Sequence, residues 1–201
     1  TTTGRVVIVD GDQVEVDVLT PHLADGPKYD RPSARPAWQD ALNRLDVDAL
    51  VAPSDLGATL LTLLAAPTIA SKRWIFSQYD HQVRLGTVLR PGAADAAVVR
   101  IVPPDVMPPA GGANRALAIS TDCNPRFVYL DPYEGTRQAV AEAYRNIACT
   151  GGEPIAVTNC LNFGNPQKPE IMWQLKESIR GLGDACRELA TPVVSGNVSL
   201  Y

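Results

Sequence analysis

A repeating apolar pattern between residues 172 and 189 constrains the fold more than any other feature of the chain. Its members recur at intervals of three and four, which places them on one face of a long helix. They are Met172, Leu175, Ile179, Leu182, Cys186 and Leu189. The apolar run 154–158 precedes this helix and the run 191–194 follows it, and both are typical of strands. The order is therefore βαβ-like.

The alternation of strands and helices extends upstream to about residue 98. Apolar runs over 98–102 and 116–120 predict two strands, joined through a segment rich in Pro and Gly over 103–112. A helix is predicted over 136–149. This order predicts an α/β (α+β) domain with a mixed sheet and with helices on one side of it.

The first 37 residues have a different pattern. Residues 5–9 and 14–18 flank Asp10-Gly11-Asp12, a turn sequence typical of a β-hairpin. Prolines at positions 21, 27, 32 and 36 then predict a linker without helix or strand over 21–37. We interpret residues 1–20 as the closing edge of a preceding domain.

One predicted helix, followed by a cluster of three aromatic residues, lies between this linker and the α/β region. Ser54 is predicted to cap a helix over 55–66, which Pro67 ends. The aromatic residues are Trp74, Phe76 and Tyr79. We expect them to take part in ordinary packing, with a clamp against the next domain as the alternative. The expected organisation is a linker with a helical segment over 21–80 and an α/β domain over 81–201.

The composition of the 201 residues argues against several classes of function. The chain is 45% hydrophobic and 20% charged, which suffices to bury a core, and its net charge of −4 implies no basic face for nucleic acid. No apolar run approaches the ~18 residues of a membrane span, and the N-terminal sequence is unlike a signal peptide. We expect a cytoplasmic location and partners other than nucleic acid or membrane.

Four cysteines raise the question of a metal site or of disulfides. None forms a C-x-x-C pair, and no histidine lies close enough in sequence to complete a zinc pattern. We expect reduced cysteines that act as small core residues. They are Cys123, Cys149, Cys160 and Cys186.

Familiar nucleotide and hydrolase motifs are absent from the sequence. It contains neither G-x-x-x-x-G-K-[ST] nor G-x-S-x-G. Its two histidines are His22, expected to be solvated in the linker, and His81, expected to be structural rather than catalytic.

Polar side chains follow three of the predicted strands, at the point where each strand ends. Ligands of α/β sheets bind beyond such ends, and Asp and Asn oxygens suit a hard cation such as Mg²⁺. Each loop alone is also typical of an ordinary turn, but three of them together favour a site. The residues are Asp122 and Asn124, Asn159 and Asn162, and Asn197 and Ser199.

Two glycines and one helix face extend this candidate site. Gly164 and Gly196 leave room for the backbone to approach a phosphate. Glu142 and Asn146 are four residues apart, so they share one face of the predicted helix, and Arg137 and Arg145 lie near them. A structural salt bridge is one interpretation of that face, and a second cation or nucleotide contact is the other.

The last seven residues, 195–201, place a Gly-Asn turn directly before a hydrophobic Leu-Tyr pair. A domain rarely ends there, so we expect the chain to be a piece of a longer protein.

The sequence resembles the synthetase (PurL) subunit family of phosphoribosylformylglycinamidine synthase, within the PurM or aminoimidazole ribonucleotide synthetase superfamily. The resemblance covers nearly all of the chain from about residue 54, in order, and the first fifty residues more loosely. The segments that carry it are 66–74, 78–80, 121–126, 129–132, 139–143, 145–147, 161–166, 168–170 and 195–201. The chain then corresponds to an internal portion of such an enzyme.

This resemblance implies a fold and a reaction. Residues 1–20 would end a PurM C-terminal-like domain, and residues 81–201 would form the second PurM N-terminal-like ATP-binding domain, truncated at its C-terminus. The family reaction of de novo purine biosynthesis forms a carbon–nitrogen bond. It converts formylglycinamide ribonucleotide, ATP and glutamine-derived ammonia to the amidine, ADP and phosphate. ATP activates the amide oxygen, which ammonia then displaces.

The resemblance also implies roles for four residues at the end of the chain. Asn159 and Gly196 would contact ATP, Asn197 would bind Mg²⁺, and Ser199 would contact the substrate. Many relatives have Asp where this chain has Asn159, so an amide replaces a charged group there. The catalytic histidines of the family lie in the first ATP-binding domain, so no catalytic residue is expected in this chain.

Further implications concern an auxiliary site and partners. Asp95, Glu142 and Asn146 match positions that hold a second nucleotide and its metal in larger relatives. The expected partners are the first PurM-like half, a glutaminase subunit (PurQ), the small subunit PurS and formylglycinamide ribonucleotide. The piece alone would be inactive. The alternatives are a non-catalytic assembly module with a structural nucleotide, or a related ATP-dependent synthetase of the superfamily.

Overall fold

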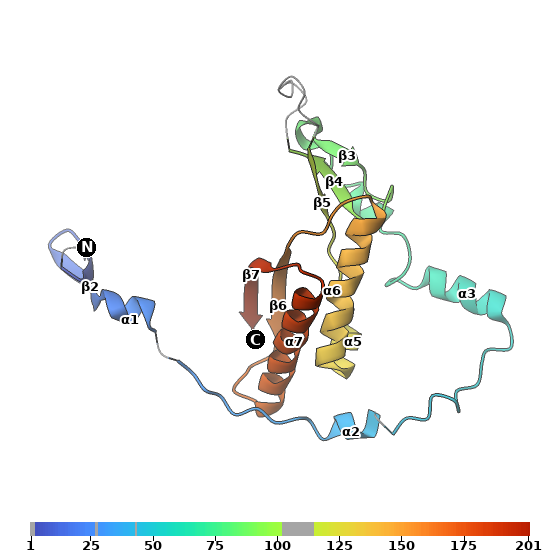
Figure 1. The fold of residues 1–201 in the computed structure, drawn as a ribbon, viewed down its shortest axis with the longest axis horizontal. Helices are drawn as coiled ribbons and strands as arrows, with labels where there is room; N and C mark the ends of the chain where they lie inside the picture. The colour runs from blue at the N-terminus through green and yellow to red at the C-terminus, as the bar shows by residue number, and fades with distance from the viewer. Residues whose placement is uncertain (1–2, 27, 43, 102–114) are drawn as a thin grey trace. The chain divides into compact units, whose positions relative to one another are not determined.

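A computed structural model describes residues 3–26, 28–42, 44–101 and 115–201 (Figure 1). Its contacts divide the chain into two compact units, Thr1–Pro32 and Ser33–Tyr201, which are described separately here. Helices and small sheets together form the mixed α/β structure that the sequence predicts. The domain boundaries expected after residues 20 and 80 stay predictions.

The first unit is a β-hairpin followed by a short helix. β1 (Arg5–Asp10) and β2 (Gln13–Leu19) pair antiparallel, and Gly11 takes a φ of 59° in the turn between them, as the hairpin prediction requires. α1 (Thr20–Ala24) then extends into the segment 21–37, which we expected to hold neither helix nor strand. Pro21 lies in its first turn, where a missing N–H breaks no helical hydrogen bond, so this proline is compatible with the helix.

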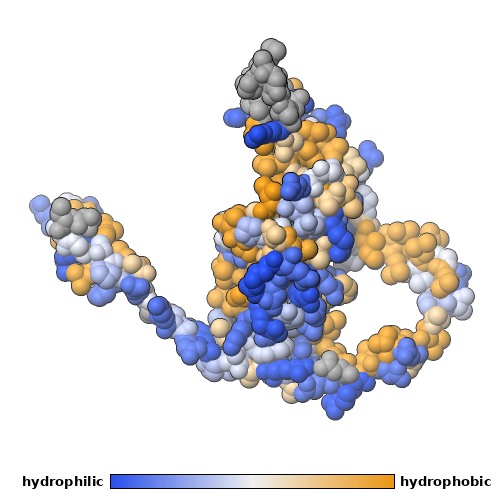
Figure 2. All heavy atoms as spheres, in the orientation of Figure 1, coloured by the Kyte–Doolittle hydropathy of each residue, from blue (hydrophilic) through white to orange (hydrophobic). Residues whose placement is uncertain are grey.

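The helix predicted near residue 55 is present as α3 (Leu56–Ala65). Its cap is Asp55 rather than Ser54, because the Asp55 carboxylate accepts a hydrogen bond from the Ala58 N–H at 2.9 Å. No residue of α3 is buried, and hydrophobic side chains gather on this helix in Figure 2. The leucines exposed by half or more are Leu56, Leu60, Leu61, Leu63 and Leu64.

Two short elements follow, α4 (Arg73–Phe76), which contains Trp74 and Phe76, and the 3₁₀ turn η1 (Val83–Leu85). Phe76 meets the edge of the His81 ring, with ring centroids 6.3 Å apart, which agrees with a structural role for His81. Trp74 and Tyr79 are 69% and 68% exposed, so the packing expected of them is found only at Phe76.

The strands form two kinds of sheet in the second unit. β3 (Thr87–Leu89), β4 (Ala97–Arg100) and β5 (Ala116–Ile119) form an antiparallel sheet in that order. β6 (Val157–Phe163) and β7 (Val193–Leu200) pair in parallel. In the described residues, antiparallel and parallel pairings therefore lie in separate sheets rather than in one. The predicted connection 103–112 and the last residue of the strand predicted over 98–102 lie outside these residues.

Three helices complete the unit: α5 (Pro125–Leu130), α6 (Pro132–Cys149) and α7 (Pro169–Glu188). α6 begins four residues before its predicted start at 136, because the Asp131 carboxylate accepts from the Glu134 N–H at 3.0 Å and Pro132 suits the first turn. α7 confirms the helix predicted from the apolar repeat. Of the described helices, none is long and apolar enough to cross a membrane.

α6 and α7 lie side by side and enclose the core (Figure 1). The buried cluster consists of Val140, Leu182, Ala185 and Cys186, with Val157 and Leu189 packed against it. The two helices approach closely at Gly181 of α7, where a side chain would overlap the Tyr133 carbonyl oxygen of α6. Gly135 similarly allows α6 to approach α5, because a side chain there would overlap the Phe127 carbonyl group.

A short segment at the start of the second unit is attached to α5. α2 (Trp38–Leu42) places the Trp38 ring on the Tyr129 ring, with centroids 4.6 Å apart and planes 13° apart. The buried Gln39 amide donates a hydrogen bond to the Leu130 carbonyl at the end of α5. The N-terminal segment of this unit is therefore part of its packed structure.

We predict that Gly181→Ala destabilises the protein by about 1–3 kcal/mol, because the added methyl group forces α6 away from α7. Gly183→Ala, in the same helix, is the matched control. Its methyl group would meet only the movable end of the Arg187 side chain, so we expect no loss or a gain of roughly 0.5–1 kcal/mol. Urea unfolding followed by circular dichroism measures both. Equal midpoints for the two variants would contradict the close-packing argument.

Candidate functional site

The register of β6 and β7 decides which of the predicted site residues meet. Asn159 pairs with Gly196, Cys160 with Asn197, and Asn162 with Ser199. The pairing is regular from Thr158 to Phe163, after one register shift between Val157 and Thr158. The register thus brings the predicted site residues of two distant segments onto neighbouring strands.

The two asparagine-rich segments are strands, which corrects the prediction that they are loops after strand ends. Asn159 and Asn162 lie inside β6, and Asn197 and Ser199 lie inside β7. The strand expected over 154–158 begins only at Val157 and continues to Phe163. Partly buried and exposed positions alternate along it, and this alternation is the pattern of a strand with one face covered.

The side chains of β6 and β7 point to the two opposite faces of this strand pair. Asn159 lies on the same face of β6 as the partly buried apolar residues of this strand. Its side chain lies directly over Gly196. A Cβ atom at Gly196 would overlap the Asn159 Oδ1 atom. The two residues expected to contact ATP therefore lie together on one face, which we call the inner face of β6–β7. Glycine is required at 196 because Asn159 occupies the space of a side chain.

The opposite face, which we call the outer face, carries the other two predicted residues. The Asn197 side chain donates a hydrogen bond from Nδ2 to the Ser199 Oγ atom at 3.2 Å. The members of the outer face are Thr158, Cys160, Asn162, Ser195, Asn197 and Ser199. All are small or medium-sized and uncharged. Ser199 is half-buried, and the other five are exposed.

A second group of polar side chains forms where β5 leads into α5. The Asp122 carboxylate accepts from Asn146 Nδ2 at 2.9 Å and from the Ser120 hydroxyl at 2.8 Å. Asn124 instead caps α5 by accepting from the Arg126 N–H at 3.0 Å, so its role is structural. The contact between Asp122 and Asn146 was missed from sequence because only the packing of α6 brings the two segments together.

The three residues of the predicted auxiliary site lie near this group to different degrees. Asn146 belongs to it directly. Glu142 lies one turn earlier on the same helix and is exposed. Asp95 precedes β4, whose first residue pairs with the last residue of β5, so Asp95 and Asp122 lie beyond the same end of that strand pair. Over the described ranges, no hydrogen bond or ion pair joins Asp95 to Glu142 or Asn146.

The salt bridges of α6 involve residues other than Glu142. Arg137 pairs with Glu134 at 3.0 Å and with Glu188 on α7 at 3.5 Å. On the same surface, the Tyr133 hydroxyl donates to Asp184 at 2.9 Å and lowers the pKa of that carboxyl group. The structural salt-bridge interpretation thus holds for Arg137, while Glu142 has no ion-pair partner in the described part of the chain.

Three of the four cysteines are placed differently from the prediction. All four are free, as expected, but only Cys186 is buried in the core. Cys123, Cys149 and Cys160 are exposed. The thiol of Cys123 is nevertheless partly desolvated, which raises its pKa, and the negative charge of Glu142 raises the pKa further.

The donor set at β7 fits Mg²⁺ better than a metal that needs a cage of protein ligands. Within the described residues, no group of three or more His, Cys, Asp or Glu side chains is placed to hold a metal ion. Mg²⁺ is bound through few protein oxygens and keeps water and phosphate oxygens as its other ligands. The Asn197 amide oxygen is compatible with this mode.

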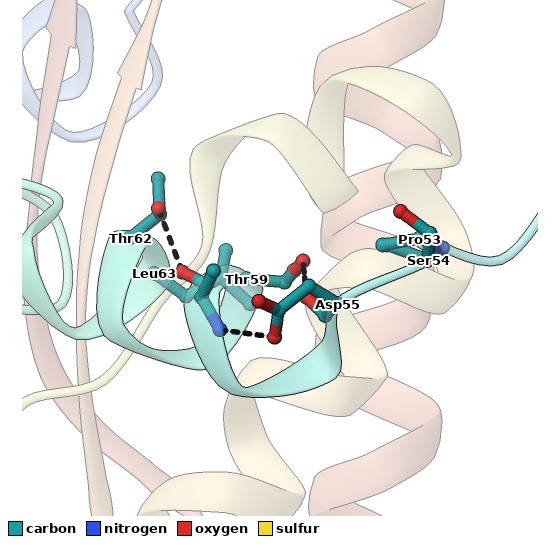
Figure 3. A pocket seen from close by; sticks show the side chains of 7 residues that line it. Pro53, Ser54, Asp55, Thr59, Thr62 and Leu63 are labelled. Carbon is teal, nitrogen blue, oxygen red and sulfur yellow. Dashed lines mark hydrogen bonds between the residues drawn. The ribbon is translucent and has the colours of Figure 1, made fainter.

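The hollow at the first turns of α3 contains none of the predicted site residues. Figure 3 shows it between Pro53, Ser54, Asp55 and the helix residues Thr59, Thr62 and Leu63. Its polar groups bond within the helix: Thr59 donates to the Asp55 carbonyl at 2.7 Å, and Thr62 to the Ala58 carbonyl at 2.9 Å. This hollow is the capped end of a helix and not the candidate site.

The mixed α/β unit, with its paired Asn–Gly and Asn–Ser positions, defines an AIR synthase type of domain. The chain belongs to the family described as AIR synthase related protein, N-terminal domain, which matches residues 93–201.

Individual relatives of this chain carry the name of one enzyme subunit. The phosphoribosylformylglycinamidine synthase subunit PurL of Anaeromyxobacter sp. is 57% identical over 190 residues, which are 94% of this chain and 24% of that protein. The subunit PurL of Deinococcus radiodurans is 51% identical over 189 residues, with the same two shares. The chain therefore spans about a quarter of the length of the curated relatives it matches.

Solved structures agree in fold. PurLQS from Thermotoga maritima matches with a TM-score of 0.68 and 27% identity, over 98% of this chain and 28% of that one. T. maritima PurL complexed with ATP matches with a TM-score of 0.64 and 27% identity, over the same shares.

We predict that the effects of Gly196→Ala and Asn159→Ala on stability are not additive. Gly196→Ala alone should destabilise the protein by about 1–3 kcal/mol, because the new methyl group displaces the Asn159 side chain. In an Asn159→Ala background that side chain is gone, so the same change should cost less. A double-mutant cycle of unfolding free energies measures this coupling. Additive effects would show that Asn159 does not lie over Gly196.

We predict that Glu142→Gln lowers the pKa of Cys123 part of the way toward its ordinary value, since partial burial, the larger cause, remains. Thiolate is the reactive form, so the pH midpoint of Cys123 alkylation should move down. Peptide-resolved mass spectrometry of iodoacetamide labelling follows this residue separately from the other cysteines. Glu134→Gln, on the same helix but paired with Arg137, should leave the midpoint unchanged. An unchanged midpoint in Glu142→Gln would show that the Glu142 carboxylate does not lie close enough to Cys123 to affect its pKa.

Proposed function

We propose that the chain is part of an ATP-dependent ligase, phosphoribosylformylglycinamidine synthase. The reaction converts formylglycinamide ribonucleotide, ATP and glutamine-derived ammonia to the amidine, ADP and phosphate. The observation that carries the proposal is the 57% identity over 190 residues to the PurL subunit of Anaeromyxobacter sp.. The complex of T. maritima PurL with ATP, which has the same fold over 98% of this chain, supports ATP as a ligand.

The geometry of β6–β7 supports a role for each predicted residue. Asn159 and Gly196 would contact ATP, to which the Asn159 amide offers a hydrogen bond. Asn197 would bind Mg²⁺ and Ser199 the substrate on the outer face. When bound, Mg²⁺ would neutralise the charge that develops on the transferred phosphoryl group.

This chain would supply half of the ATP site, and a first PurM-like half would supply the remainder with the catalytic bases. We further propose PurQ as glutaminase and PurS as small subunit, which the name PurLQS of the T. maritima structure favours. Formylglycinamide ribonucleotide as substrate is supported by the T. maritima PurL complex with FGAR. The four free cysteines agree with a cytoplasmic location.

A second candidate function is a structural nucleotide module. It is favoured by the Asp122–Asn146 hydrogen bond, with Glu142 one turn away and Asp95 beyond the same strand end. Titration with ATP and Mg²⁺ separates the two candidates. Tight binding to the isolated chain would support the structural module, whereas binding that requires the partner half supports a shared active site.

We predict that the isolated chain forms no amidine from formylglycinamide ribonucleotide, ATP and ammonium, and that activity requires the first PurM-like half. Product formation followed by ADP release and by mass spectrometry checks this. Turnover by the chain alone would contradict the shared-site proposal.

In the full-length protein, we predict that Asn197→Ala lowers turnover far more than stability. In metal sites generally, loss of a group that only hydrogen-bonds a metal ligand weakens metal binding roughly 10–100-fold. Loss of a direct ligand should therefore reduce turnover at limiting Mg²⁺ by at least about tenfold. Asn124→Ala is the matched control: it removes the cap of α5, and we expect about 1 kcal/mol of lost stability with turnover unchanged. Equal turnover in wild type and Asn197→Ala would exclude the metal assignment.

A further inference from the structure

Asn162 lies on the outer face of β6–β7 in the same row as Ser199. The register pairs these two residues directly, and it pairs Cys160 with Asn197 one step earlier. Asn162 therefore extends the pair Asn197–Ser199 across to the neighbouring strand. No role for Asn162 follows from the family resemblance.

The hydrogen bonds of Asn162 turn its amide in a defined direction. Nδ2 donates to the Cys160 carbonyl oxygen at 3.3 Å and to the Cys160 Sγ atom at 3.4 Å. The NH₂ group thus points back along its own strand, and the Oδ1 atom accepts no hydrogen bond from the described residues. Asn197 uses its NH₂ group in the same way, on Ser199.

A donor and an acceptor therefore stand side by side in the row of Asn162 and Ser199. The Ser199 hydroxyl accepts from Asn197 and keeps its own proton to donate, while the Asn162 carbonyl oxygen is an acceptor. This arrangement is complementary to an amide or to a pair of hydroxyl groups.

The side chains of the outer face offer no positive charge to a phosphate group. Neither β6 nor β7 contains a charged residue. Phosphate sites use Arg, Lys or converging backbone N–H groups, which the side chains of this face do not supply. An uncharged hydrogen-bonding group fits the outer face better.

We propose that Asn162 is a further substrate-contacting residue, which together with Ser199 binds the uncharged amide or ribose hydroxyl part of the ribonucleotide substrate. The inference rests on the proposed function, because it takes formylglycinamide ribonucleotide as the ligand. Its contacts within the chain are two long hydrogen bonds inside one strand, and its side chain is exposed. Stability should therefore depend little on it.

The test measures dissociation constants by calorimetry on the full-length protein. The ligands are formylglycinamide ribonucleotide and its dephosphorylated nucleoside. Asn162→Ala should weaken both by the same factor, roughly three- to tenfold, as expected for one neutral hydrogen bond. Gln167→Ala is the control, because it removes an exposed amide from the turn that follows β6. It should change neither constant. Asn162→Ser provides a second variant that keeps a small polar residue in the strand, with the same loss expected.

Each outcome decides between the possibilities. Unchanged affinity in both Asn162 variants would overturn the inference while leaving the proposed function intact. A loss confined to the ribonucleotide would also overturn it, because Asn162 would then act on the phosphate. If the wild-type protein binds neither ligand and forms no amidine, the proposed function fails and the inference fails with it.

Discussion

The close contact of α6 with α7 is the constraint on which the second unit depends. Gly181 of α7 lies against the Tyr133 carbonyl of α6. α6 carries Asn146 to Asp122, while α7 is the crossover that makes β6 and β7 parallel neighbours. Both groups of candidate site residues are thus held by one helix pair.

Elements with a strong period were predictable from the sequence. The apolar repeat of α7 and the hairpin turn at Gly11 are local signals, and local signals survive folding. The boundaries were less certain because capping residues decide them. Asp55 and Asp131 each accept an N–H bond three residues ahead, and these bonds move the helix starts away from where the periodicity alone placed them.

The candidate site was predictable in its residues but not in its arrangement. Asparagine favours turns, so the segments around Asn159 and Asn197 were interpreted as loops, whereas both lie inside strands. The Asp122–Asn146 contact and the pairing of Asn159 with Gly196 depend on tertiary packing and register, for which one sequence holds no signal. The same limit explains why the three exposed cysteines were expected in the core.

The register shift at the start of β6–β7 has a consequence for how this sheet can vary. Val157 pairs with Val193 and Thr158 with Ser195, so Val194 is an extra residue, a bulge, in β7. Side chains alternate with a period of two, so regular pairing of Val194 with Thr158 would exchange the two faces of β7 downstream. Gly196 would then turn away from Asn159, and Asn197 would turn inward against the helices. The bulge therefore sets the phase of the strand, and a shorter β7 without Val194 would hold the same pairs of site residues in a regular ladder.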